Sequence, residues 1–153
     1  MSFDICTLAT APYTRLPLTP SAMSTVHEIL YCSVLAPDQP PGIVGRIVSQ
    51  ARARNAQHRI TGLLVFDGLR FCQHVEGARD EVGALMRRIA HDPRHHAVRV
   101  VYEGARAQRR YQRFDLGFAQ SEGADDMAGI HDLRGQAALD RFLLLRPGFD
   151  ISG

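Results

Sequence analysis

A glutamine occupies a position where the sequence pattern leaves little room for a polar side chain. Gln73 lies between Phe71 and Val75 in a segment of strand-forming residues, and side chains two apart on a strand share one face. A carboxamide on such a face needs hydrogen-bond partners. Its amide donates at one end and accepts at the other, so rotation reverses its polarity. Taken alone, Gln73 fits a glutamine paired with backbone at a sheet edge better than it fits a functional amide.

Two further polar side chains could act together with such an amide. Tyr31 lies in the strand-like segment 28–35, on the same face as Ser33, and Asn55 ends the helix-like segment 41–55. A few convergent polar groups in an otherwise apolar crevice suit a planar ligand.

The central element that must position Gln73 is a β-hairpin. The apolar segments 59–66 and 71–77 are separated by Asp67-Gly68. This dipeptide between two apolar runs is a strong hairpin signal, because both residue types tolerate positive φ.

Two segments show helical spacing of their apolar residues. The first follows Pro40 and Pro41, and proline is well tolerated in the first turn of a helix. The second is stopped by Asp92-Pro93. The two stripes are Ile43, Val44, Ile47, Val48 and Ala51, and Val82, Leu85, Met86 and Ile89.

The remaining segments complete an α+β fold of the ferredoxin-like type. Val98, Val100 and Tyr102 alternate as a fourth strand, and Phe114, Leu116 and Phe118 alternate as a fifth. The order βαββαβ plus a further strand predicts one sheet with two helices on one face. A short helix at 135–145 is expected to cover the other face. Tyr31 and Gln73 should then meet beneath the groove between the first two helices.

Four short segments at this spacing resemble the BLUF domain, a blue-light sensor that uses FAD. The resemblance covers about residues 27–120, through every expected element of that range. The segments are Tyr31-x-Ser33, Asn55-Ala56-x-x-x-Ile60-Thr61-Gly62, Phe71-x-Gln73-x-Val75-Glu76-Gly77 and Asp92-x-Arg94-His95.

The resemblance implies a cofactor and a photochemical role for named residues. It implies that FAD lies between the two helices, that Asn55 hydrogen-bonds the polar edge of the flavin, and that Gln73 lies between the flavin and Tyr31. Light is then expected to drive electron and proton transfer from the tyrosine, after which the glutamine amide rearranges and absorption shifts reversibly to the red. The other cofactor-binding residues implied by the resemblance are Ser33, Phe71, Arg94 and His95.

The chain departs from this family on the fifth strand. The family often has Trp-x-Met there, whereas this chain has Phe114 and Leu116. Phenylalanine lacks an indole N–H and leucine lacks a thioether, so neither side chain can hydrogen-bond Gln73. Arg54 also stands before Asn55, where a smaller polar residue or histidine is common.

Composition favours an ordinary single-domain protein. The chain has 153 residues, 45% hydrophobic and 22% charged, and a net charge of +2, which gives no general case for binding nucleic acid or a membrane surface. Three cysteines without metal-type spacing favour a reduced, cytoplasmic setting and no metal site. We expect a flexible extension at 1–26, a flavin-binding domain at 27–120 and a helical cap or output segment at 121–153.

Two other classes of function find some support in the sequence. Arg106, Arg109, Arg110 and Arg113 with Tyr111 would suit a ferredoxin-like nucleic-acid-binding module, but the cluster is confined to one connection and fits a solvated loop better. An enzyme is not expected, because the histidines lack catalytic partners at suitable spacing. No effector segment is apparent, so we expect signalling through a downstream protein partner or a homo-oligomer.

Overall fold

The computed structural model describes residues 25–118, 124–146 and 150–152. They form a six-stranded sheet in the order β4-β1-β3-β2-β5-β6. All neighbouring strands are antiparallel except β2 and β5, which are parallel. The strands are β1 (Val26–Leu35), β2 (Thr61–Phe66), β3 (Arg70–Gly77), β4 (His95–Arg106), β5 (Phe114–Phe118) and β6 (Asp150–Ser152).

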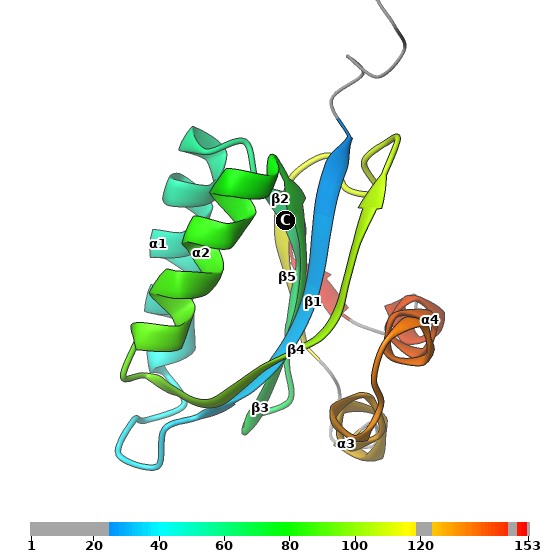
Figure 1. Cartoon of the computed structure of the whole chain (residues 1–153). Helices are drawn as coiled ribbons and strands as arrows, with labels where there is room; N and C mark the ends of the chain where they lie inside the picture. The colour runs from blue at the N-terminus through cyan, green and yellow to red at the C-terminus, as the bar shows by residue number, and fades with distance from the viewer. Residues whose placement is uncertain (1–24, 119–123, 147–149, 153) are drawn as a thin grey trace, which may run out of the picture.

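Four helices lie on the two faces of this sheet. Figure 1 shows α1 (Ile43–Gln57) and α2 (Arg79–His91) side by side on one face. The same view shows α3 (Ala124–Asp132) and α4 (Gln136–Leu145) on the opposite face, where we call them the C-terminal cap. The ferredoxin-like α+β architecture predicted from the sequence is therefore confirmed. None of the helices in the described ranges is long and apolar enough to cross a membrane.

The hairpin between β2 and β3 brings Gln73 to the centre of the sheet. Gly68 adopts a φ of +99° in the connecting turn, which favours glycine, and the Asp67 carboxylate accepts hydrogen bonds from the backbone N–H groups of Leu69 and Arg70 at 2.9 and 2.6 Å. Gly62 of β2 lies so close to β3 that a side chain there would collide with the backbone carbonyl of His74. The Thr-Gly of the sequence motif thus permits tight strand pairing beside Gln73.

The sheet separates the apolar core into layers. Beneath α1 and α2, one cluster includes Val48, Leu64 and Phe114, and a second includes Tyr31, Val75 and Leu85. On the opposite face, strand residues such as Cys72 pack against the cap through Met127, Ile130, Ala138 and Phe142. Adjacent residues on β1 and β3 consequently belong to different environments.

Three features differ from the sequence-based expectations. After the fifth strand the sequence predicts only a helix at 135–145, whereas the structure also has helix α3 and strand β6. The regular alternation expected for Val98, Val100 and Tyr102 is wrong, because Leu30 pairs with Tyr102 while Tyr31 pairs with Val100. This irregularity inserts one extra residue into β4 and buries Val101 instead of Val100, as a β-bulge does. The expected extension at 1–26 falls almost entirely outside the described residues.

Candidate functional site

Tyr31 and Gln73 form a buried hydrogen-bonded pair at the centre of the sheet. They are direct register partners on β1 and β3, and their exposed fractions are 1% and 4%. The Tyr31 hydroxyl donates to Gln73 Oε1. Burial raises the pKa of Tyr31 far above its ordinary value, so the phenol keeps its proton at neutral pH. A phenol proton already aimed at a rotatable amide is a short path for proton transfer.

A cavity of about 380 Å³ lies above this pair, between α1, α2 and the sheet. Its size falls within the usual range of small-molecule sites, about 300 to 1,000 Å³. Both Tyr31 and Gln73 reach its wall. The other lining residues are Ile47, Gln50, Ala51, Arg54, Asn55, Leu64, Leu85, Arg88, Ile89, His91, Asp92, Arg94, His95 and Phe114.

Two polar side chains on the cavity wall have buried atoms without protein partners. Asn55 of α1 is 1% exposed, and neither its Oδ1 nor its Nδ2 makes a hydrogen bond. On α2, Nε and Nη2 of Arg88 are also buried without a partner. Such atoms are rare in folded proteins because each costs about 1 to 3 kcal/mol. Their position on facing helices indicates a ligand with donor and acceptor groups between them.

Arg94 and His95 close one end of the cavity. Arg94 donates to the Asp92 carboxylate at 2.7 Å and to Gln50 Oε1 at 3.1 Å, which leaves it fixed instead of solvated. Burial would raise the pKa of Asp92, but hydrogen bonds from Arg94 and its charge hold that pKa below its usual value. Burial also lowers the pKa of His95. This end of the cavity therefore presents a tethered cation beside an imidazole that favours its neutral form.

Ser33 and Phe71 lie one layer behind this end. Ser33 Oγ is 3.0 Å from His95 Nδ1, and the Phe71 ring lies 4.7 Å from the His95 ring, centroid to centroid. Neither residue lines the cavity. Five of the seven residues proposed from sequence thus line the cavity. Ser33 and Phe71 do not line it, but both contact His95, which does.

The residues that depart from the family pattern occupy different places. Phe114 lines the cavity, whereas Leu116 does not and packs in the apolar cluster under α1. Leu116 is paired with Leu64, which in turn is paired with Gln73. One strand therefore separates Leu116 from the glutamine. Arg54 contributes to the cavity wall although the residue is exposed.

Sequence reasoning missed Arg88. It follows Leu85 by three residues and precedes Ile89, so it lies on the flank of the apolar stripe of α2. A cation at that flank is ordinarily a surface residue whose stem covers apolar area. Only the folded structure shows that two of its guanidinium nitrogens are buried at the cavity wall.

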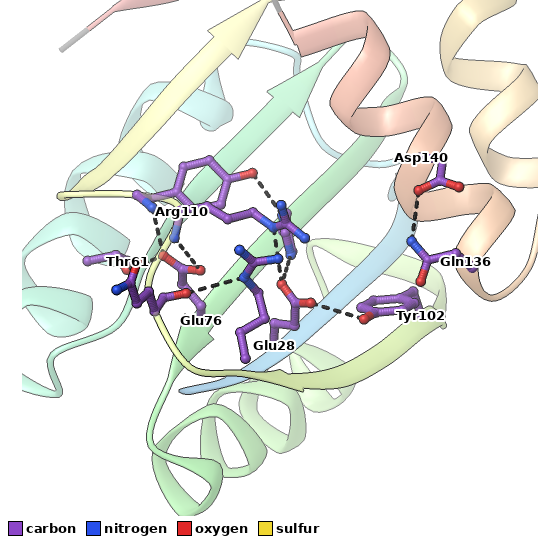
Figure 2. Close-up of polar contacts among 11 residues, drawn as sticks. Glu28, Thr61, Glu76, Tyr102, Arg110, Gln136 and Asp140 are labelled. Carbon is purple, nitrogen blue, oxygen red and sulfur yellow. Dashed lines mark hydrogen bonds and ion pairs between the residues drawn. The ribbon is translucent and has the colours of Figure 1, made fainter. Parts of the chain in front are cut away.

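A separate polar network lies on the other face of the sheet, beside the apolar cluster under the C-terminal cap (Figure 2). His74, which follows Gln73, points away from it: its Nε2 lies 3.0 Å from Glu28 Oε2 and its Nδ1 lies 2.8 Å from the Tyr111 hydroxyl. Tyr102 donates to the other oxygen of Glu28 at 3.0 Å. His74 therefore has a carboxylate partner after all, supplied by a strand far away in sequence.

The arginine-rich connection is bound into the protein around Glu76. The backbone N–H groups of Arg110 and Tyr111 donate to the Glu76 carboxylate at 3.0 and 2.7 Å, and Arg109 donates to the Thr61 hydroxyl at 2.8 Å. Arg110 also reaches Glu28 at 3.4 Å. The interpretation of this cluster as a solvated loop therefore holds only in part, because Arg109 and Arg113 are exposed while Tyr111 is buried. Because these groups satisfy buried carboxylates, the connection gives little support to a nucleic-acid-binding surface.

The pKa of the buried Glu28 carboxyl links this network to the stability of the fold. Burial alone would raise its pKa, but hydrogen bonds from His74 and Tyr102 and the charges of His74 and Arg110 outweigh burial and lower it to about 2. A carboxylate whose folded pKa lies below its unfolded value stabilises the fold above the unfolded pKa of about 4.5. That contribution is lost as the pH falls toward 2.

We therefore expect Glu28→Gln to lower the free energy of unfolding by about 2 kcal/mol at pH 7, since it removes one charge from a buried network. The difference from wild type should shrink at about pH 3, and urea unfolding at both pH values measures it. The control is Glu103→Gln, an ion-paired but exposed residue on β4 whose change should cost less than about 0.5 kcal/mol. A pH-independent loss in Glu28→Gln would contradict this electrostatic account.

Comparison with known proteins agrees with this geometry. Residues 26–117 match the family model described as "BLUF: Sensors of blue-light using FAD". The chain is 37% identical over 70 residues to the blue light- and temperature-regulated antirepressor BluF of Escherichia coli K12, an alignment covering 46% of this chain and 17% of that protein. The chain belongs to the BLUF family of blue-light sensors.

Solved structures of similar proteins give the same fold. The dark-state structure of BlrB, a BLUF protein, has a TM-score of 0.66 and 26% identity, covering 78% of this chain and 93% of that one. BlrP1 of Klebsiella pneumoniae with FMN and cyclic diGMP has a TM-score of 0.57 and 32% identity, covering 62% of this chain and 26% of that one. The chain thus matches less than a fifth of the E. coli protein and about a quarter of BlrP1.

Proposed function

We propose that this protein binds FAD in the cavity between α1 and α2 and senses blue light by rearranging the Tyr31–Gln73 hydrogen bond. The observation that carries the proposal is the buried carboxamide of Asn55, which faces the cavity with both of its polar atoms unpartnered. A flavin ring has adjacent carbonyl and N–H groups along one edge. An amide can pair with such an edge by donating and accepting together.

The other walls of the cavity fit the same cofactor. Ile47 and Phe114 supply apolar surface for a planar ring, and the Arg88 guanidinium offers donors to a carbonyl oxygen. Arg94, held by Asp92, is placed to neutralise a phosphate or contact the ribityl chain. When bound, the flavin supplies light absorption and a strong one-electron acceptor, which no side chain of this protein provides.

The residues of the chain provide the reversible proton movement. Tyr31 is an oxidisable group on the cavity wall, and its hydroxyl proton can pass to Gln73 Oε1 along the existing hydrogen bond. A glutamine that has changed its protonation or orientation presents different donors and acceptors to the cavity. Return of both the electron and the proton to Tyr31 in darkness restores the starting hydrogen bond, so each cycle leaves the protein unaltered.

We infer that the signal leaves through the C-terminal cap, to a downstream protein or a second copy of the chain. The cap packs directly on the sheet face behind the Tyr31–Gln73 pair, where Phe142 contacts His74 edge to face at 5.9 Å. Leu144 of α4 is 70% exposed. An apolar residue there is available to a partner.

The sharpest test of the cofactor site is Asn55→Ala. Because the carboxamide has no protein partner, its loss should stabilise the flavin-free protein by up to about 1 kcal/mol, and alanine also favours the helix. FAD affinity should fall about tenfold or more with the loss of two hydrogen bonds. Fluorescence titration with FAD and urea unfolding of the flavin-free protein measure the two effects.

Ser49→Ala, at an exposed position of the same helix, is the matched control and should change neither quantity appreciably. If Asn55→Ala instead destabilises the flavin-free protein and binds FAD as well as wild type does, then Asn55 has a structural role and the proposal loses its main support.

A further inference from the structure

Two cysteines lie side by side on the cap-facing surface of the sheet. Cys32 of β1 and Cys72 of β3 are direct register partners, and their sulfur atoms are 3.2 Å apart. Both are free thiols, with exposed fractions of 1% and 0%. The next register pair along the same two strands is Tyr31 and Gln73, which faces the cavity. Cross-strand thiols therefore lie directly behind the proposed photoactive pair.

The backbone geometry at this position is compatible with a disulfide. Directly opposite residues on antiparallel strands have Cβ atoms about 4.5 to 5.5 Å apart. A disulfide spans Cβ atoms about 3.5 to 4.5 Å apart. Because the two sulfur atoms already point toward each other, bond formation needs a small approach of the strands and no change of register.

The surroundings of the two sulfur atoms differ. The hydrogen bond from Cys72 lowers the pKa of Cys32 against the effect of burial, and His131 of α3 and Arg99 of β4 lower it further. Burial raises the pKa of Cys72. His131 also lies 3.1 Å from the backbone carbonyl of Phe71, which holds its ring over this part of β3. His131 of the cap therefore favours the thiolate form of Cys32, whereas burial favours the thiol form of Cys72.

We propose that Cys32 and Cys72 form a redox-active dithiol that low-molecular-weight disulfides oxidise to a bond between β1 and β3. The Cys32 thiolate attacks one sulfur of the external disulfide, forming a mixed disulfide and releasing one thiolate. Cys72 then loses its proton and attacks Cys32 Sγ, which releases the second thiolate. The two cysteines are oxidised, one external disulfide is reduced to two thiols, and the cysteine protons end on those thiols.

Burial makes the cap a gate for this reaction. Met127 and Ile130 of α3 pack in the same cluster as both cysteines, so a reagent reaches Cys32 only when α3 moves away from the sheet. Such local opening occurs in native proteins at a lower free energy than global unfolding. Oxidation is therefore slow, over minutes to hours, and its rate reports how often α3 opens.

The test uses the full chain carrying Cys6→Ser, which retains only Cys32 and Cys72. After incubation with excess oxidised glutathione, free thiols are alkylated under denaturing conditions and the protein is weighed by mass spectrometry. The expected product is a monomer with no alkyl group and no glutathione, lighter by two hydrogens, that regains two alkylation sites after reduction. A peptide pair joining residues 32 and 72 should be recovered from its digest.

Two variants in the same background separate the roles of the sulfur atoms. Cys72→Ser should accumulate a glutathione adduct on Cys32. Cys32→Ser should form an adduct on Cys72 at least about tenfold more slowly. Equal rates in the two variants would overturn the assignment of Cys32 as the attacking thiol. Two alkylated cysteines per chain after a day would show that the pair is only core packing, and disulfide-linked dimers would show that oxidation does not join β1 to β3 within one chain. These readouts need neither light nor FAD and stand apart from the proposed function.

Discussion

Replacing Gln73 with leucine is expected to leave a protein that binds FAD but whose absorption no longer shifts in light. Leucine fills similar space on β3 but can neither donate nor accept a hydrogen bond, so nothing in the cavity floor can rearrange. The Tyr31 hydroxyl also loses its acceptor, which should lower stability by about 1 to 2 kcal/mol. Absorption spectra recorded before and after blue illumination measure the loss.

Gln50→Leu provides the matched control for this variant. Gln50 is also a cavity-lining glutamine, but it is exposed on α1 and bonds Arg94 instead of Tyr31. The Gln50→Leu variant should keep the full light-induced shift and bind FAD slightly more weakly. A normal shift in Gln73→Leu would remove Gln73 from the switch altogether.

Replacing Tyr31 with phenylalanine is expected to abolish the red-shifted state while the fold and the cofactor are retained. Phenylalanine keeps the ring that packs with Val75 and Leu85 and deletes only the hydroxyl that donates to Gln73. The loss should exceed about 90% of the wild-type shift, because no second phenol lines the cavity in the part of the chain that the structure describes.

Tyr102→Phe serves as a control for the loss of a tyrosine hydroxyl elsewhere in the sheet. Tyr102 bonds Glu28 on the cap side, so its variant should lose some stability and keep the light response. Tyr31→Phe that still forms the red-shifted state in full yield would mean that another group supplies the proton and the electron.

The parts of the fold that follow local rules could be predicted from the sequence. Asp67-Gly68 marked the hairpin, the stripes of α1 and α2 marked their buried faces, and Pro93 marked the end of α2. Once the strand order was inferred, the meeting of Tyr31 and Gln73 followed from the alternation of side chains. The same alternation correctly placed His74 on the opposite face.

The features that were missed depend on contacts between distant segments. His74 has a partner because β1 brings Glu28 beside it, a pairing that no spacing in the sequence indicates. The bulge in β4 is set by its register against β1, and the burial of two Arg88 nitrogens by the packing of α2 on the sheet. The two cysteines likewise become neighbours only through strand pairing.

The most direct test of the central claim is the light-minus-dark absorption spectrum of the purified full chain loaded with FAD. The account predicts flavin bands that move together to longer wavelength under blue light and return in darkness through repeated cycles. It also predicts that this difference spectrum vanishes in Gln73→Leu and Tyr31→Phe at equal FAD occupancy. A wild-type protein that binds no flavin, or whose bound flavin bleaches or stays unchanged in light, would contradict the account.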